Sequence, residues 1–141
     1  MLFRSGFNLI SLGEGAIPYL PALLRAKEED VRSQAVEIIR QHGAGEIAID
    51  PAALIADRCW RVREGASGAL VKILGREATP WLTKLAKDSD SGVRGAAVSA
   101  LAQIGDADAM VPFLKDDNPL VRATAVHQLG TVLKRDRKSV V

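Results

Sequence analysis

One arrangement of apolar and polar residues occurs four times along the chain. A polar turn leads into a Val-Arg pair, and apolar residues then recur at the spacing of one face of an α-helix. The pairs are separated by 31, 31 and 28 residues and stand at Val31-Arg32, Val62-Arg63, Val93-Arg94 and Val121-Arg122. An alanine follows each arginine by three positions, and a large aliphatic residue follows it by seven. The pattern therefore predicts four amphipathic helices of one repeating type.

A shorter apolar segment precedes each of these helices. Pro18, Pro51 and Pro80 lie near the starts of three segments, where a proline costs little because its missing N–H would have no helical partner. Each copy thus predicts two helices joined by a polar turn. One such hairpin cannot bury both of its apolar faces, whereas a stack of hairpins can. The expected fold is all-α: an α-solenoid of about four helical hairpins, preceded by a partial N-terminal helix.

The repeat register sets the expected boundaries. We expect a repeat domain at residues 6–135, made of a partial repeat at 6–16 and four repeats at 17–45, 46–77, 78–106 and 107–135. The remaining segments, 1–5 and 136–141, can be encoded by nucleotide sequences that resemble the two ends of a DNA-sequencing adapter. We therefore expect a non-native leader and tail around an excerpt of a longer protein.

Composition narrows the classes of protein that the chain can belong to. Hydrophobic residues make up 48% but aromatic residues only 4%, so the core must be built from small aliphatic side chains that allow close helix packing. The net charge of +2 gives no reason to expect an anionic partner. The single cysteine, Cys59, cannot form an internal disulfide, which fits a reducing compartment such as the cytoplasm. No apolar run reaches membrane-spanning length, so we expect no membrane association.

The Val-Arg arginines and the acids of the turns are the most regular polar features. One interpretation is a row of arginines that grips phosphates. We favour a structural ladder, because an arginine beside a core valine can pack its stem while its guanidinium binds turn carboxylates of its own or the adjacent repeat. Asp90 or Ser91 can also cap the following helix. The expected ladder residues are Arg32, Arg63, Arg94, Arg122, Asp57, Asp88, Asp90 and Asp116.

The turn and helix together form a recognisable motif. Residues 88–105 match Asp-x-(Asp/Asn)-x-x-Val-Arg-x-x-Ala-x-x-x-Leu-x-x-x-Gly in full, and residues 116–129 match well, although Leu133 stands where the glycine belongs. The motif resembles the HEAT-like repeat of the phycobilisome-lyase type, and the resemblance covers roughly residues 7–134. It implies an α-solenoid. Such repeats serve many unrelated roles, so the lyase type suggests a phycobilin lyase-like subunit or chaperone only as an alternative function.

The second helix of each hairpin is expected to line the concave face of the solenoid. Its outward positions are small or polar and predict a shallow groove for a peptide or protein surface. The expected binding residues are Ser33, Glu37, Arg40, Glu64, Lys72, Ser99, Gln103 and His127. We therefore expect a non-catalytic scaffold for protein–protein interaction, and uncapped ends of the stack could also drive self-association.

Residues 57–63 offer the best alternative site. They place Trp60 among three arginines, as in proteins that stack bases and contact phosphates, so a nucleic-acid-binding solenoid is a further hypothesis. The small net charge favours a solvated turn instead. His42 and His127 are far apart and neither precedes a glutamate, unlike the His-Glu iron ligands of HEAT-like deoxyhypusine hydroxylases. With no zinc spacing, phosphate loop or nucleophile–base pair, we expect no enzyme activity, cofactor or metal.

Overall fold

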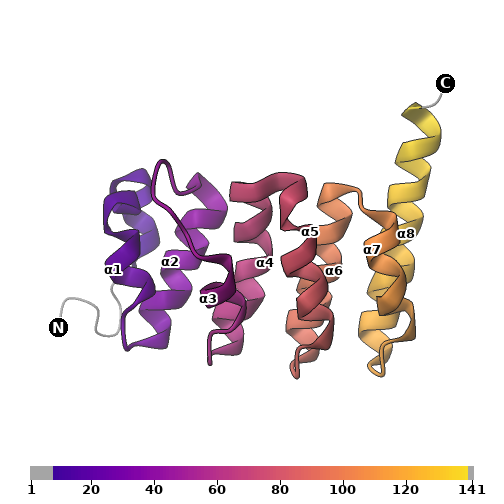
Figure 1. Cartoon of the computed structure of the whole chain (residues 1–141), viewed down its shortest axis with the longest axis horizontal. Coiled ribbons are helices and arrows are strands. Elements are labelled where there is room, and N and C mark those ends of the chain that lie inside the picture. Colours follow the sequence, from indigo (N-terminus) through magenta and orange to yellow (C-terminus); the bar gives the residue numbers. More distant parts are fainter. Residues whose placement is uncertain (1–7, 140–141) are drawn as a thin grey trace.

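The computed structural model describes residues 8–139, and the regular structure in that range is helical. Helical hairpins stand side by side in chain order, with the first and last described helices at opposite ends of the row (Figure 1). The hairpins are α1 (Leu20–Leu24) with α2 (Glu29–His42), α3 (Pro51–Ile55) with α4 (Trp60–Leu74), α5 (Thr79–Lys84) with α6 (Ser91–Ile104), and α7 (Ala107–Met110) with α8 (Pro119–Ser139). The predicted α-solenoid of four hairpins is confirmed.

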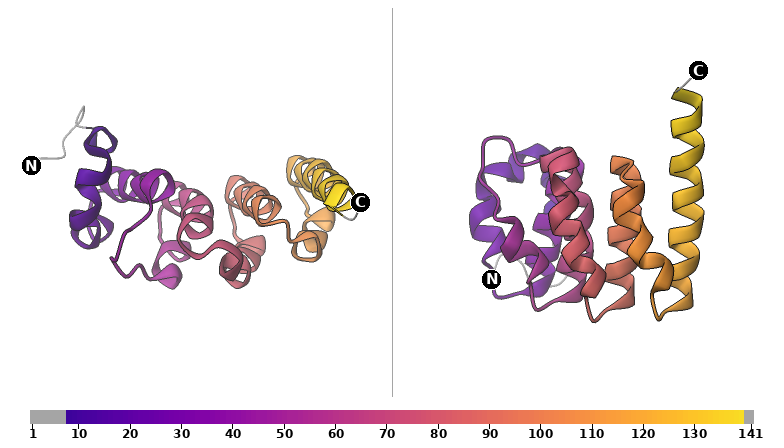
Figure 2. Two further views of the ribbon diagram at one scale, coloured as in Figure 1. Left: turned by 90° about the horizontal axis from the view of Figure 1, so that it is seen from above. Right: turned by 45° about the vertical axis from the view of Figure 1, so that its right-hand side comes forward.

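The hairpins form two layers. Figure 2 shows the long second helices, α2, α4, α6 and α8, in one row and the short first helices in the other. Each second helix packs against the next along the row. The first helices are extended or connected by short 3-10 segments, namely η2 (Gly75–Ala78), η3 (Leu85–Lys87) and η4 (Val111–Lys115). The second helices therefore provide the continuous interface of the stack.

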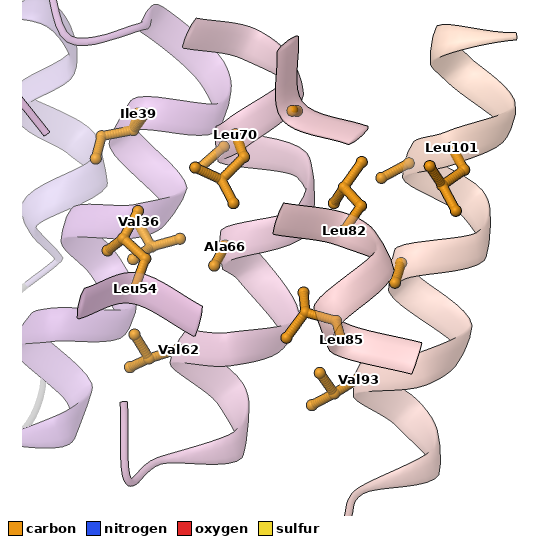
Figure 3. Close-up of a cluster of buried hydrophobic side chains, with 14 of the residues drawn as sticks. Val36, Ile39, Leu54, Val62, Ala66, Leu70, Leu82, Leu85, Val93 and Leu101 are labelled. Atoms are coloured by element: carbon orange, nitrogen blue, oxygen red, sulfur yellow. The ribbon is translucent and has the colours of Figure 1, made fainter. Parts of the chain in front are cut away.

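Small aliphatic residues build the core between the layers. The predicted alanine column is fully buried, with exposed fractions of 0% at Ala35, Ala66, Ala97 and Ala125. Leu82 of α5 and Leu85 of η3 point between α4 and α6 (Figure 3), where they meet core residues of both second helices. At the end of the row the predicted stripe is less complete, because Leu129 of α8 is only half-buried.

Glycine permits the close approach of α4 to α2. A Cβ atom on Gly65 would lie 3.0 Å from Cγ1 of Val36, and one on Gly68 would lie 2.9 Å from Cδ of Arg40. Glycine is a poor helix former, so these two positions weaken α4 in isolation. Packing against α2 explains why they are tolerated.

The start of the described chain is a 3-10 segment, η1 (Leu9–Tyr19), rather than the end of an α-helix. Residues 6 and 7 of the partial repeat expected at 6–16 lie outside the described residues, and the segment is interrupted at Gly13, where φ is 54°. The segment packs on α2, and the Leu9 N–H donates to Oε1 of Gln34 at 2.6 Å. A glycine break therefore turns the chain directly into the first hairpin.

The ends of the second helices follow the glycine pattern. Gly105 stops α6 in the left-handed conformation, with φ 82° and its N–H on the carbonyls of Leu101 and Ala102. Leu133 occupies the matching position in α8, and that helix continues to Ser139, so it projects beyond its neighbours (Figure 1). The expected leader at 1–5 lies outside the described residues, and residues 136–139 of the expected tail continue α8.

Candidate functional site

Three arginines bind carboxylates of the next hairpin. Nε donates to Oδ2 of the partner at 2.9 Å in Arg32–Asp57, 2.7 Å in Arg63–Asp88 and 2.7 Å in Arg94–Asp116. Nη2 donates to the other oxygen of the same aspartate at 3.0–3.1 Å. Each pair is thus bidentate, the arrangement in which a guanidinium binds a carboxylate most specifically.

The same arginines also hold the turns of their own hairpins. Arg63 donates Nη1 to the carbonyl of Asp57 and Arg94 donates Nη1 to the carbonyl of Asp88, each at 2.7 Å. The Asp88 carboxylate in turn accepts the N–H of Asp90 at 2.9 Å. Each such turn therefore binds one arginine through its backbone and another through its aspartate, which connects successive hairpins into one ladder.

The ion pairs shift the titration of their carboxyl groups. Hydrogen bonds from Arg94 hold the pKa of Asp116 below its usual value. Burial disfavours ionisation of Asp57 and Asp88, but hydrogen bonds from arginine and from backbone N–H groups outweigh it, so the pKa of both carboxyls is also lowered. These aspartates are ionised and paired at neutral pH.

Two expected ladder residues behave differently from the rest. Asp90 bonds to no arginine in the described structure; its carboxylate caps α6 by accepting the N–H of Val93 at 3.0 Å. The adjacent helix start offers Asp90 a nearer donor than an arginine, and of the two caps predicted for this helix, Asp90 or Ser91, it is Asp90 that serves. Arg122 donates Nη1 to the carbonyls of Asp116 and Asp117 at 2.7 and 3.1 Å, but no carboxylate among the described residues pairs with it.

An open groove of about 680 Å³ runs along the second helices α2, α4 and α6. Six of the eight residues expected on the binding face line it: Ser33, Glu37, Arg40, Glu64, Ser99 and Gln103. Lys72 and His127, also expected on the binding face, are exposed but do not line the groove. The Lys72 side chain reaches toward Gly43 at the end of α2, and His127 belongs to α8, beyond the helices that form the groove.

Trp60 and Arg61 also line the groove, although the sequence pattern had suggested them only for nucleic acid. Trp60 is 44% exposed, and Cζ of Arg61 lies 5.4 Å from the centroid of its ring, within the range of a cation–π contact. Helical spacing could have placed Trp60 in the groove, because it stands four residues before Glu64 on the same face of α4.

The groove carries charges of both signs. Glu37 accepts hydrogen bonds from Arg40, which lower the pKa of its carboxyl, and from Gln41 at 2.6 Å. Glu64 and Arg61 add one further charge of each sign. Between α4 and α6, Ser67 is 1% exposed, and its Oγ is the buried side-chain polar atom without a hydrogen-bond partner in the described chain. The groove thus has no dominant charge.

The described residues show no grouping suited to metal binding and no helix long and apolar enough to cross a membrane.

The three arginines of residues 57–63 are not equivalent. Arg63 is engaged by Asp88, whereas Arg58 and Arg61 are exposed. The basic cluster that the sequence offered to nucleic acid is therefore smaller than its three arginines suggested.

Consecutive hairpins whose second helices pack in one row define an α-solenoid repeat protein. The family model for HEAT repeats matches residues 51–130, more than half of the chain, and the chain belongs to the HEAT-repeat family. The match begins at α3 and ends within α8. HEAT repeats usually serve as scaffolds for protein interaction. No curated protein matches the chain.

Proposed function

We propose that this chain is a non-catalytic scaffold that binds an extended segment of a partner protein along α2, α4 and α6. The observation that carries the proposal is the groove of about 680 Å³, which crosses three consecutive repeats and exposes Trp60 in its wall. A binding surface assembled from several repeats suits a long, linear ligand better than a small molecule. The proposal includes a cytoplasmic location, which only the lone Cys59 supports.

The chemistry of the groove favours a peptide of mixed polarity. Trp and Arg are the side chains most often found at the energetic centre of protein interfaces, and here Trp60 and Arg61 stand together. Glu37, Arg40 and Glu64 can match charges of either sign, while Ser99 and Gln103 can bond a peptide backbone. We therefore expect an aromatic or aliphatic anchor on the partner at Trp60, flanked by polar residues.

The experiment is selection of peptides from a displayed random library against the folded chain. We expect the selected peptides to bind Arg61→Ala at least tenfold more weakly, since truncation of a residue at the energetic centre of an interface costs about 2 kcal/mol or more. Lys84→Ala is the matched control, because Lys84 stands 4.5 Å over the ring of Trp81 but outside the groove. Peptides that bind both variants as well as the original chain would contradict the proposed site.

Two alternatives have weaker support. A nucleic-acid-binding role rests on Arg58, Trp60 and Arg61; it predicts binding to single-stranded DNA that weakens steeply with salt, whereas the scaffold predicts no such binding. A phycobilin lyase-like or chaperone role rests on the resemblance of the repeat motif alone. It predicts that mixing the chain with a phycobilin changes the absorption spectrum of the pigment.

A further inference from the structure

The outer face of α8 repeats a surface that the preceding second helices use for packing. The residue five positions after the valine of each Val-Arg pair is Val36, Ser67, Val98 or Val126. The first three are 1%, 1% and 0% exposed, because each second helix is covered by the next. Val126 is 62% exposed, and Leu133, seven residues further along the same helix, is 48% exposed. The face of α8 thus has the side chains of an internal interface without its covering hairpin.

Arg122 likewise lacks the contact with a following hairpin that the other arginines of the ladder make. Its Nη1 holds two carbonyls of its own turn, as Nη1 of Arg32 does with the carbonyls of Ala26 and Lys27. Arg32 also binds a carboxylate of the following hairpin, Asp57, whereas no described carboxylate serves Arg122. The guanidinium of Arg122 is therefore already held by its own turn, but it lacks the carboxylate of a following hairpin.

A second copy of the chain does not supply that acid. In each later turn the bridging aspartate stands six residues before its own Val-Arg arginine. In the first hairpin that position is Ala26, and Lys27 occupies the place of Asp117, which bonds Arg94 at 2.9 Å. A copy stacked on α8 in the same register would bring Lys27 toward Arg122, and η1 already packs on its α2. Charge and packing both oppose this arrangement.

We propose that the outer face of α8 binds a helical hairpin of the same repeat type whose turn carries an aspartate. The aspartate forms a bidentate pair with Arg122, and the second helix of the hairpin covers Val126. The internal interfaces α2–α4, α4–α6 and α6–α8 provide the geometry, and the unmatched Arg122 provides the charge complementarity. This surface is separate from the groove, so the two proposals can fail independently.

The test joins residues 1–132 of the chain directly to a second copy of residues 105–139, which appends a hairpin in the natural register. In this extended chain, Arg122→Met is combined with Asp116→Asn in the appended copy only, as a double-mutant cycle. We expect each single change to lower the folding equilibrium constant and the two to be coupled by about tenfold. Additive effects would overturn the proposal.

A labelling experiment provides a readout that does not depend on global stability. A thiol placed by Val126→Cys is expected to react with a soluble maleimide at least tenfold more slowly in the extended chain than in the original chain. Lys84→Cys, on an exposed helix outside the contact, is expected to react equally in both. Equal rates at position 126 would overturn the proposal, as would a dimer of the original chain that protects this thiol.

Discussion

Arg63 and Asp88 lie in different repeats, yet Nε and Nη2 of the arginine reach both carboxylate oxygens of the aspartate, at 2.7 and 3.1 Å. The side chains are only 14% and 8% exposed. The same relation links Arg32 to Asp57 and Arg94 to Asp116. The ladder therefore adds a directional polar contact to a core that is otherwise made of small, interchangeable aliphatic residues.

Removing one arginine of the ladder should lower stability without removing the helices. Arg94→Met leaves Asp116 ionised and largely buried without its guanidinium, and breaking such a pair costs about 3 kcal/mol. Urea denaturation followed by circular dichroism measures the loss. Arg25→Met, at an exposed arginine, should change the free energy of unfolding by less than about 0.5 kcal/mol. Equal effects at the two positions would argue against a stabilising ladder.

Stability should fall in acid. The pKa values of Asp57, Asp88 and Asp116 are lowered in the folded chain, so folding favours their ionised forms. Their contribution is complete above the unfolded-state pKa of about 4 and is lost as the pH falls through the lower folded-state values. Urea midpoints measured between pH 7 and pH 2 should show this loss. In Asp88→Asn the decline should be shallower; an unchanged pH profile would contradict the assignment.

Replacing Ser67 should stabilise the stack. Its Oγ is buried without a hydrogen-bond partner at a position where other repeats have Val36 and Val98. Ser67→Val removes the unsatisfied hydroxyl and adds apolar contact, for an expected gain of about 1 kcal/mol. Ser67→Ala, which removes only the hydroxyl, separates the two contributions. A lower thermal midpoint for both variants would show that the hydroxyl is satisfied in solution.

Two helical glycines should respond oppositely to alanine. Gly95→Ala meets no atom within 4 Å and should gain about 1 kcal/mol from helix propensity. Gly65→Ala places a Cβ 3.0 Å from Cγ1 of the buried Val36, so the clash should outweigh the propensity gain and destabilise α4. Denaturant midpoints of the two variants test the difference, and equal gains would show that α2 and α4 can separate freely.

The stack could be predicted well from the sequence, because residues at the same position of successive repeats make equivalent contacts with the neighbouring hairpins. The alanine column and the hairpin turns follow directly from that register. The sequence pattern left open whether each arginine pairs with a turn carboxylate of its own repeat or of the adjacent repeat, since both choices satisfy the same spacing. The structure shows that the carboxylate partners of Arg32, Arg63 and Arg94 lie in the next repeat, while their own turns offer backbone carbonyls.

The groove was harder to predict, because side-chain direction matters as much as repeat position. Lys72 stands 31 residues before Gln103 and shares its repeat position, yet only Gln103 lines the groove. Trp60 was noticed for its arginine neighbours rather than for its helical face. The partial repeat at 6–16 was inferred from apolar spacing; in the described residues 9–12 it is a 3-10 turn rather than the end of an α-helix, and it stops at Gly13.

The ladder of ion pairs has a direction, because the first hairpin has Ala26 at the position where each later turn has its bridging aspartate. Arg122 in the last described hairpin has no matching aspartate in the first, so a head-to-tail contact between two copies would lack the ion pair that joins neighbouring hairpins within the chain. Repetitive proteins with complementary termini can grow into rings or filaments when their concentration rises. Here a single alanine takes the ion pair away from a head-to-tail contact, while the internal repeats keep the aspartates that hold them together.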